Sequence, residues 1–316
     1  MKKIIALLCV LVMALSLAAC STGSTGYTIG ICQLVTHDGM DAATQGFMDA
    51  VTEALGEENV SFDVQNAAGD SNTCATIVNG FVAAEVDLIM ANATPALQAA
   101  AAATEDTPIL GTSVTEYGVA LEIDNFNGLV GTNISGTSEL APLDQQAAKI
   151  KTWCPDAKNV GLLYCSAEAN TQYQVDTVEA LLTDMGYTCT KYPFTDSNDV
   201  AAVTQSAADN SDVIYVPTDN TVASNTGIVD GICRPAGVPV FAGEEGICAG
   251  CGVATLSISY YALGVTTGKM AAQILKGEAK VAEMSIAYAE AFTPKYNVAI
   301  CADLGLTPPE GYIAIG

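Results

Sequence analysis

The amino-acid sequence predicts an α/β protein made of two doubly wound parallel-sheet lobes joined by a hinge. The chain has 316 residues, about twice a typical domain of roughly 100 to 200 residues. From Tyr27 onward, short apolar runs alternate with segments of helical periodicity, which is typical of parallel strands covered by helices on both faces. The same succession occurs twice along the chain, so we expect two similar lobes.

The first half alternates strands with amphipathic helices. Ala43, Phe47, Ala50 and Val51 recur at helical spacing, so residues 38–55 are expected to form a helix with one apolar face. The β-branched and apolar runs between such segments are expected to be strands. The strands are predicted at 28–33, 60–65, 87–91 and 108–112, and the helices at 38–55, 72–84 and 95–103.

The second half repeats this order. Val175, Val178 and Leu182 lie on one face of a predicted helix over 168–185. The loops also correspond, because residues 93–96 follow the third strand of the first half and residues 218–221 follow the third strand of the second. The strands are predicted at 160–165, 188–193, 213–217 and 238–242, and the further helices at 199–208 and 220–233.

The tail is expected to complete the two sheets. Residues 259–275 have helical periodicity, while 287–292 and 297–300 are short extended pieces. We expect the chain to cross between the lobes near 133–137, 255–259 and 289–293. The predicted N-terminal lobe is therefore 27–135 with 257–291, and the predicted C-terminal lobe is 136–256 with 292–316.

Composition and charge exclude several classes of partner. Half of the residues are hydrophobic, so the chain can bury a full core. Eleven Lys and Arg residues face 35 Asp and Glu residues, and the net charge is −24. Nucleic acid is therefore excluded as a partner, and an anionic membrane surface would repel the chain. Any membrane attachment then requires an anchor.

The amino terminus offers such an anchor. Lys2 and Lys3 precede an apolar run, 4–17, that is too short for a stable membrane span. The Leu-Ala-Ala-Cys sequence ending at Cys20 resembles the bacterial lipoprotein signal, in which the cysteine is acylated. We expect a signal peptide at 1–19, a lipid anchor on Cys20 and a tether at 20–26, on the outer face of the cytoplasmic membrane. An ordinary signal peptide with an incidental cysteine is the alternative.

The remaining cysteines are unusual for an exported protein. Nine are left after Cys9 and Cys20 are set aside, and an odd number cannot pair completely. Cys248 and Cys251 have the spacing of a redox or zinc pair, but neither a second pair nor a histidine cluster accompanies them. We interpret them as part of a cysteine-rich surface loop, with redox or metal chemistry as the alternative.

Catalytic templates are missing from the sequence. No Gly-x-Ser-x-Gly, P-loop or Gly-x-Gly-x-x-Gly motif is present, and His37 is the single histidine. His37 lies in a Thr-His-Asp-Gly loop, where it either faces a ligand or starts a helix. The sequence predicts no enzyme, no cofactor and no metal site.

A binding site is better supported. Hydroxyl, amide and carboxyl side chains follow the carboxyl ends of the predicted strands, where parallel α/β sheets bind their ligands. Any one of them could instead be a helix N-cap, but caps alone do not require acids and amides at matching strand ends. The candidate ligand-binding residues are Gln33, Thr36, Thr94, Thr112, Ser113, Ser166, Glu168, Asn170, Thr218, Asp219, Asn220 and Glu244.

Within this set we expect separate partners for the two charged groups of an amino acid. Asp219 or Glu168 has the charge to hold an ammonium group, and Asp219 is the main candidate. Thr94, Ser113 and Asn170, with backbone N–H groups, are expected to hold the carboxylate. The single arginine, Arg234, ends a predicted helix and is expected to face water.

Several segments carry a specific resemblance, the most diagnostic being the Tyr-Val-Pro-Thr-Asp-Asn run at 215–220. The others are 29–33, 62–67, 93–95, 160–164, 168–170, 221–224, 239–244 and 264–277. In these segments the chain resembles the substrate-binding lipoproteins of ABC transporters. More narrowly, it resembles the family that binds tryptophan and other aromatic amino acids. Thr36, Asp38 and the Glu116–Tyr117 pair depart from the family pattern.

The resemblance implies a monomeric Venus-flytrap protein of the periplasmic-binding type I fold. Such a protein closes on one small amino acid, here tryptophan or another aromatic one, and presents it to an ABC permease. Thr94, Thr112, 168–170 and 218–220 carry over as ligand contacts. Three alternatives stay open: a binding protein for a nucleoside or sugar, an exported ligand sensor, and a redox enzyme that uses Cys248 and Cys251.

Overall fold

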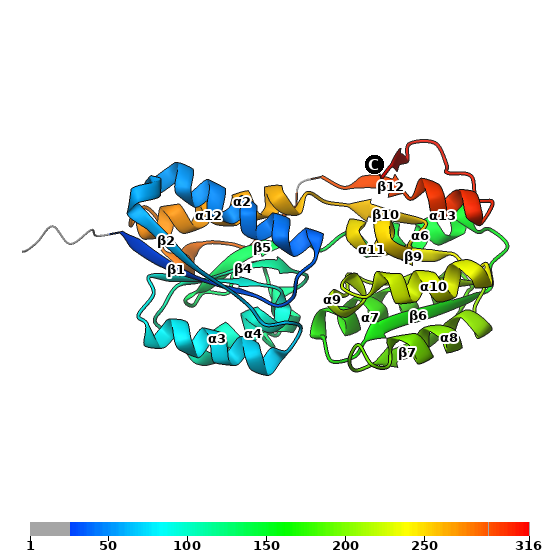
Figure 1. Ribbon diagram of the computed structural model, residues 1–316, viewed down its shortest axis with the longest axis horizontal. Helices are drawn as coiled ribbons and strands as arrows, with labels where there is room; N and C mark the ends of the chain where they lie inside the picture. The colour runs from blue at the N-terminus through cyan, green and yellow to red at the C-terminus, as the bar shows by residue number, and fades with distance from the viewer. Residues whose placement is uncertain (1–25, 290, 316) are drawn as a thin grey trace, which may run out of the picture.

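The computed structural model describes residues 26–289 and 291–315. Its elements form two lobes side by side, each a mainly parallel sheet with helices on both faces (Figure 1). The predicted fold class is confirmed. The expected signal peptide, Cys20 and all of the tether except its last residue lie outside the described residues.

The first sheet has six strands in the order β11-β5-β4-β3-β1-β2, and neighbouring strands are parallel. Helices α3 and α4 cover one face and α2 and α12 cover the other. The strands are β1 (Tyr27–Gln33), β2 (Val60–Asn66), β3 (Leu88–Asn92), β4 (Ile109–Val114), β5 (Ile134–Ser138) and β11 (Ala287–Tyr288). The helices of this lobe are α2 (Asp38–Leu55), α3 (Ser71–Ala83), α4 (Thr94–Ala103), α5 (Tyr117–Ala120) and α12 (Tyr260–Leu275), with short 3-10 turns at Glu57–Asn59 and Val281–Glu283.

The second sheet has seven strands in the order β13-β12-β10-β9-β8-β6-β7, and β12 runs antiparallel to β10. Helices α6, α7 and α13 cover one face, and α8, α10 and α11 cover the other. The strands are β6 (Asn159–Cys165), β7 (Thr188–Phe194), β8 (Val213–Val216), β9 (Val240–Ala242), β10 (Ala254–Ser257), β12 (Thr293–Tyr296) and β13 (Ile313–Ala314). The helices are α6 (Leu143–Trp153), α7 (Ala169–Asp184), α8 (Val200–Asn210), α9 (Asn220–Ala223), α10 (Thr226–Ala236), α11 (Glu245–Cys251) and α13 (Val298–Asp303).

Helices α2 and α12 pack at unusually close range because glycines lie between them. A Cβ on Gly264 of α12 would lie 2.0 Å from the carbonyl oxygen of Ala43, and one on Gly46 of α2 would lie 2.2 Å from that of Tyr261. Any larger residue would force the helices apart. Helix α12 follows a crossing between the lobes, so this contact fixes the start of α2 relative to the hinge.

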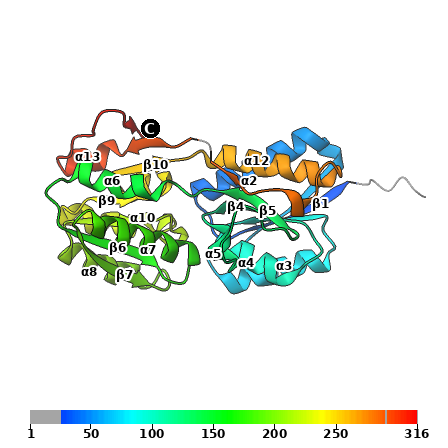
Figure 2. The same cartoon turned by 180° about the vertical axis from the view of Figure 1, so that it is seen from behind.

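The first crossing lies later than predicted. Residues 134–138 form β5 of the first sheet, so neither a crossing at 133–137 nor a lobe boundary after residue 135 is correct. The chain enters the second lobe between β5 and α6. It returns between β10 and α12 and leaves again between β11 and β12. In both views these segments run along one edge of the molecule, beside α12 and β12 (Figures 1 and 2).

Four element predictions were wrong. The helix expected over 220–233 is divided into α9 and α10, because Ser224 and Asn225 form a turn between them. The segment expected as an extended piece at 297–300 begins α13, whose N-cap Asn297 accepts the N–H of Ile300. The extended piece at 287–292 is divided between β11 and the last crossing. The Cys248–Cys251 segment is helix α11 and not a surface loop.

Within the described residues, no helix combines the length and the apolar character that a bilayer crossing requires.

Candidate functional site

A cavity of about 190 Å³ lies between the two lobes. It is lined by residues that follow the carboxyl ends of β1, β2 and β3 in the first sheet and of β6, β7 and β8 in the second. Each parallel sheet places these ends at one edge, and the two edges face each other across the cavity. The predicted location of the site, outside the carboxyl ends of the strands, matches this geometry.

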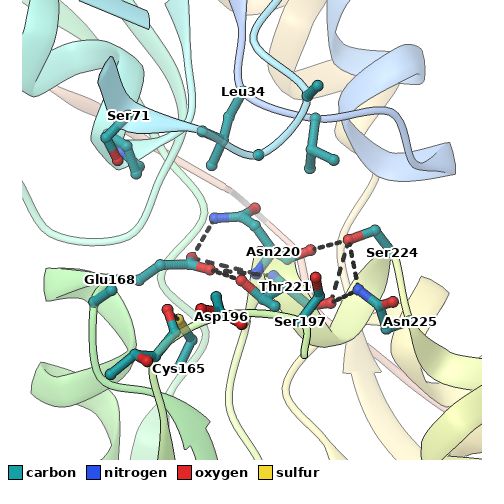
Figure 3. A pocket seen from close by; sticks show the side chains of 16 residues that line it. Leu34, Ser71, Cys165, Glu168, Asp196, Ser197, Asn220, Thr221, Ser224 and Asn225 are labelled. Atoms are coloured by element: carbon teal, nitrogen blue, oxygen red, sulfur yellow. Dashed lines mark hydrogen bonds between the residues drawn. The ribbon is translucent and has the colours of Figure 1, made fainter. Parts of the chain in front are cut away.

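The two walls of the cavity differ in chemistry (Figure 3). The wall from the first lobe is mainly apolar and carries no charged side chain, whereas the wall from the second lobe is polar and acidic. The first wall is Leu34, Val35, Ala68, Gly69, Ser71 and Pro95. The second wall is Cys165, Ala167, Glu168, Thr195, Asp196, Ser197, Asn220, Thr221, Ser224 and Asn225.

Glu168 is the central carboxylate of the second wall. Its Oε2 accepts the side-chain N–H of Asn220 at 2.6 Å and the backbone N–H at 3.3 Å. Its Oε1 accepts the hydroxyl of Thr221 at 2.9 Å and the backbone N–H at 3.1 Å. Burial raises the pKa of Glu168, while the donors on Thr221 and Asn220 act in the opposite direction. The carboxylate is thus rigidly held at the edge of the cavity.

Asp219 has a different place from the one expected. It is 1% exposed and does not line the cavity. Its Oδ1 accepts the N–H of Val222 at 2.8 Å, as the N-cap of α9, and its Oδ2 accepts the N–H of Cys165 at 2.7 Å. Burial and the neighbouring carboxylate of Glu168 raise the pKa of Asp219 well above its ordinary value. Glu168 thus lines the cavity, whereas Asp219 lies behind it.

Most other predicted site residues hold the loops in place. Gln33 donates to Asp41 Oδ1 at 2.6 Å, and Thr112 shares a 3.2 Å hydrogen bond with Thr137. Ser166 donates to the carbonyl of Phe194 at 3.1 Å. Glu244 caps α11 by accepting the N–H groups of Gly246 and Ile247. Thr36 lies with Gln33 at a separate surface groove, and Thr94 is buried at the start of α4.

Two predicted residues keep an unused polar atom. Asn170, at 3% exposure, donates to the carbonyl of Thr218 at 3.1 Å, but its Oδ1 has no partner. Ser113, at 5% exposure, has a strained φ of 52° and an Oγ without a partner. Buried polar atoms without partners are rare and costly, so each calls for a ligand or a water molecule.

The sequence analysis missed part of the cavity. Leu34 and Pro95 look like ordinary core residues in the sequence, yet they line the first wall. Asp196 and Ser197 lie in the loop after β7, whose polar character is the one signal that could have identified them. Pro95 lies in the 93–95 segment that carries the family resemblance, but no motif distinguishes Leu34, Asp196 or Ser197.

The hinge holds an acid that the sequence analysis also missed. Glu139, between β5 and α6, accepts the hydroxyls of Tyr260 and Thr115. Burial raises the pKa of Glu139 to about 7, although both hydroxyls oppose the change. Burial likewise raises the pKa of Glu244 to about 7. The region where the lobes join therefore holds carboxyl groups that titrate near neutrality.

The cysteines between residues 26 and 315 are all free thiols. Cys248 and Cys251 lie buried in α11, and burial raises both of their pKa values. Within 26–289 and 291–315, no group of three or more His, Cys, Asp or Glu residues is arranged to hold a metal ion.

Comparison with known proteins gives the family. A family model described as "ABC transporter substrate binding protein" matches residues 28–314. The tyrosine-binding protein of Clostridioides difficile (strain R20291) is 35% identical over 255 residues, which cover 79% of this chain and 73% of that protein. An ABC domain from Streptococcus pneumonia, solved in complex with L-Trp, superposes with a TM-score of 0.87 at 31% identity and covers 92% of this chain and 100% of its own.

A further solved structure gives a second comparison. The ligand-free, open form of a substrate-binding protein with adhesive properties from Clostridium difficile is 37% identical, covering 92% of this chain and 99% of its own, but its TM-score is 0.69. The present structure is thus more similar overall to the L-Trp complex than to the open, ligand-free structure, despite the lower identity. Together with the matched family model, the two sheets and the cavity between them show that this chain belongs to the ABC transporter substrate-binding proteins, with the periplasmic-binding type I fold.

Proposed function

We propose that this chain captures tyrosine, tryptophan or another aromatic amino acid between its lobes and delivers it to a membrane permease. Proteins of this family bind substrates for ABC transporters and are not enzymes. The observation that supports the ligand most directly is the contrast between the apolar first wall and the acidic second wall of the cavity.

The apolar wall suits an aromatic ring. Leu34, Val35 and Pro95 present aliphatic surface to the cavity, and ring burial against such groups is driven by the hydrophobic effect. A sugar, with hydroxyls on every face, would leave some of them without partners there. This wall therefore favours a ligand with one apolar face.

The acidic wall suits an ammonium group. Glu168 lines the cavity, and the described lining residues include neither Lys nor Arg. An ammonium group that loses its water inside a closed site requires a charged partner, and Glu168 provides one. We assign the carboxylate of the ligand to hydroxyl groups that line the cavity, which include those of Ser71, Thr195 and Ser197.

The relatives also support an aromatic amino acid as the ligand. One relative carries the name of a tyrosine-binding protein and one neighbour was solved with L-Trp. The matched parts cover 79% and 92% of this chain, respectively.

The proposal is tested by thermal-shift screening of the purified protein against all amino acids, nucleosides and sugars. A ligand at 100 times its Kd adds about 2.7 kcal/mol of stability, which raises the Tm by roughly 4 to 5 °C for a chain of this size. We expect the largest shifts with tyrosine and tryptophan. A larger shift with a nucleoside or a sugar would overturn the aromatic assignment.

We also propose that Cys20 is acylated, so that a monomeric protein is held outside the cytoplasm on the outer face of the membrane. The signal sequence described above supports the anchor. Replacing Cys20→Ser should release the protein or leave it unprocessed in a membrane-fractionation experiment. A processed Cys20→Ser protein that stays on the membrane would contradict the anchor, and sedimentation of a dimer would contradict the monomer.

A further inference from the structure

The three segments that cross between the lobes are tied together on the second-lobe side by one short stretch, residues 242–245. The first crossing enters α6, where the side chain of Gln146 donates to the carbonyl of Gly243 at 3.0 Å. On the same helix, the buried Lys149 donates to the carbonyl of Ala242 at 2.6 Å. Helix α6 is therefore fixed to the segment that leads into α11.

Glu245, the first residue of α11, holds the other two crossings. Its carboxylate forms an ion pair with Lys295 of β12, whose Nζ lies 2.7 Å from Oε2 and 2.8 Å from Oε1. Its Oε2 also accepts the hydroxyl of Ser257, the last residue of β10. Strands β10 and β12 run side by side, one leaving the second lobe and the other entering it (Figure 1). All three crossings thus meet at the start of α11.

A second set of contacts ties the crossings together on the first-lobe side. Glu139 of the first crossing accepts the hydroxyl of Tyr260, which begins α12 after the second crossing. The N–H of Ala289, at the third crossing, donates to the carbonyl of Ser138 at 3.2 Å. Between the two sets of contacts, the second crossing contains only residues 258–259. These two residues are the shortest connection between the parts that each set holds together.

We infer that Glu245 is a positioning residue for ligand capture: by holding β10 and β12 on α11, it makes the second lobe turn as one body about residues 258–259 when the lobes close. The inference rests on the proposed capture of a ligand between the lobes, but not on the identity of that ligand. Without the ion pair, β10 and β12 can move separately from α11. Part of the free energy of binding would then go into ordering them, and the affinity would fall.

Charge reversal tests this role, because both side chains of the ion pair are partly exposed and tolerate a change of charge. Glu245→Lys places a second cation beside Lys295, whereas Glu245→Lys combined with Lys295→Glu restores an ion pair of reversed polarity. Each variant is titrated with L-tyrosine and L-tryptophan by calorimetry. We expect Glu245→Lys to weaken binding about 5-fold, and the reversed pair to bind within about 2-fold of the wild type.

Glu179→Lys is the matched control. It disturbs a similarly exposed ion pair of the same lobe, in which Lys191 lies on β7 at the opposite edge of the sheet from β12. Because this pair is not at a crossing, Glu179→Lys should leave Kd unchanged.

Hydrogen exchange without ligand distinguishes positioning from a general loss of stability. In Glu245→Lys, the amides of 254–260 and 293–296 should exchange at least about 5-fold faster, while those of β7 and α8 exchange as in the wild type. Unchanged Kd in Glu245→Lys, faster exchange over the whole second lobe, or a loss of affinity that the reversed pair does not restore would overturn the inference. If the wild type binds neither aromatic amino acid, the proposed ligand is wrong, while the exchange pattern still tests the contacts of Glu245.

Discussion

The two walls of the interlobe cavity have opposite chemistry although they come from similar lobes. The first lobe contributes aliphatic residues such as Leu34 and Pro95, while the second contributes Glu168 and Asp196. Both sets lie in loops that follow the carboxyl ends of parallel strands. The shared architecture thus fixes where a ligand binds, and the loop residues decide which part of the ligand each lobe recognises.

This division assigns separate energetic roles to the lobes. Burial of a ring against the first wall depends on apolar area, which is nearly independent of pH. Recognition of an ammonium group by the second wall depends on ionised carboxylates and therefore on pH. Substitutions in the two walls should then differ in both size and pH dependence.

The largest effect is expected for Glu168→Gln. The substitution keeps the shape of the side chain but removes the charge that the ligand ammonium requires, at a cost of about 2 to 3 kcal/mol, or roughly 30- to 150-fold in Kd. Calorimetric titration with L-tyrosine measures it. Glu179→Gln, at a surface ion pair of the same helix, is the matched control and should leave Kd unchanged.

Asp219→Ala distinguishes the two acids. It leaves the N–H groups of Cys165 and Val222 without their acceptor, so the free energy of unfolding should fall by about 2 to 4 kcal/mol in urea titrations. If Asp219→Ala instead weakened binding as strongly as Glu168→Gln at unchanged stability, Asp219 would be the ammonium partner after all.

The next effect is a pair of opposite pH dependences. The pKa of Glu168 is raised above its ordinary value of 4.5, so as the pH falls, protonation competes with the ligand ammonium and the affinity drops, by up to about 10-fold per pH unit.

The stability of the protein without ligand should change in the other direction. Glu139 and Glu244 have pKa values raised from 4.5 to about 7, so the folded state binds more protons than the unfolded state between these values.

The sign follows from linkage: stability without ligand falls as the pH rises from 4.5 to 7, by on the order of 3 kcal/mol for each of these two groups at most. Urea unfolding and calorimetry at pH 5, 6 and 7 measure the two trends. Stability and affinity that rise together over this range would contradict the raised pKa values assigned to Glu139 and Glu244, which are buried and have no ion-pair partner among the described residues.

A smaller effect is expected in the apolar wall. Leu34→Ala removes aliphatic surface from the cavity and should weaken binding of tyrosine and tryptophan about 5-fold, without changing the pH dependence of Kd. Val78→Ala in the same core cluster is the control, because it lowers stability but does not touch the cavity. An affinity for aromatic ligands that survives Leu34→Ala unchanged would remove this wall from ring recognition.

The sequence predicted the helices whose apolar periodicity is strong. Residues 38–55 were predicted as a helix and form α2 with the same bounds, because Ala43, Phe47 and Val51 recur on one face. Helix α11 was missed because two glycines and two cysteines give it a weak helical propensity. It is stabilised instead by the Glu244 cap and by the burial of its cysteines, which only tertiary structure reveals.

The candidate site, like the helices, was predicted only where its residues are conspicuous in the sequence. Glu168 and Asn220 were found because charged and amide side chains at strand ends stand out in a sequence. Leu34 and Pro95 were not found, because an apolar residue that contacts a ligand has the same sequence signature as one that packs in a core. The hydrogen bond from the N–H of Cys165 to Asp219 Oδ2 joins residues 54 positions apart. No local pattern could therefore have shown that the carboxylate of Asp219 already accepts hydrogen bonds within the protein.

The smallest effect is expected for the Cys248→Ser, Cys251→Ser double variant. Both thiols are buried inside the second lobe and do not line the cavity. Cys251 Sγ lies 3.3 Å from the carbonyl oxygen of Ile247, and Cys248 Sγ lies 3.6 Å from the carbonyl oxygen of Gly252. Their raised pKa values keep them protonated, and a protonated buried thiol neither attacks a disulfide nor binds a metal.

Serine can make the same two hydrogen bonds, so the double variant should lose only about 1 to 2 kcal/mol of stability, from poorer packing. Its Kd for L-tyrosine should stay within about 2-fold of the wild type, because α11 does not line the cavity. Arg234→Ala, which breaks surface ion pairs with Asp230 and Asp303, should likewise leave Kd unchanged and serves as the comparison. A large loss of affinity confined to the cysteine variant would instead show that α11 transmits closure to the cavity, since Glu244 and Glu245 at its start adjoin the hinge.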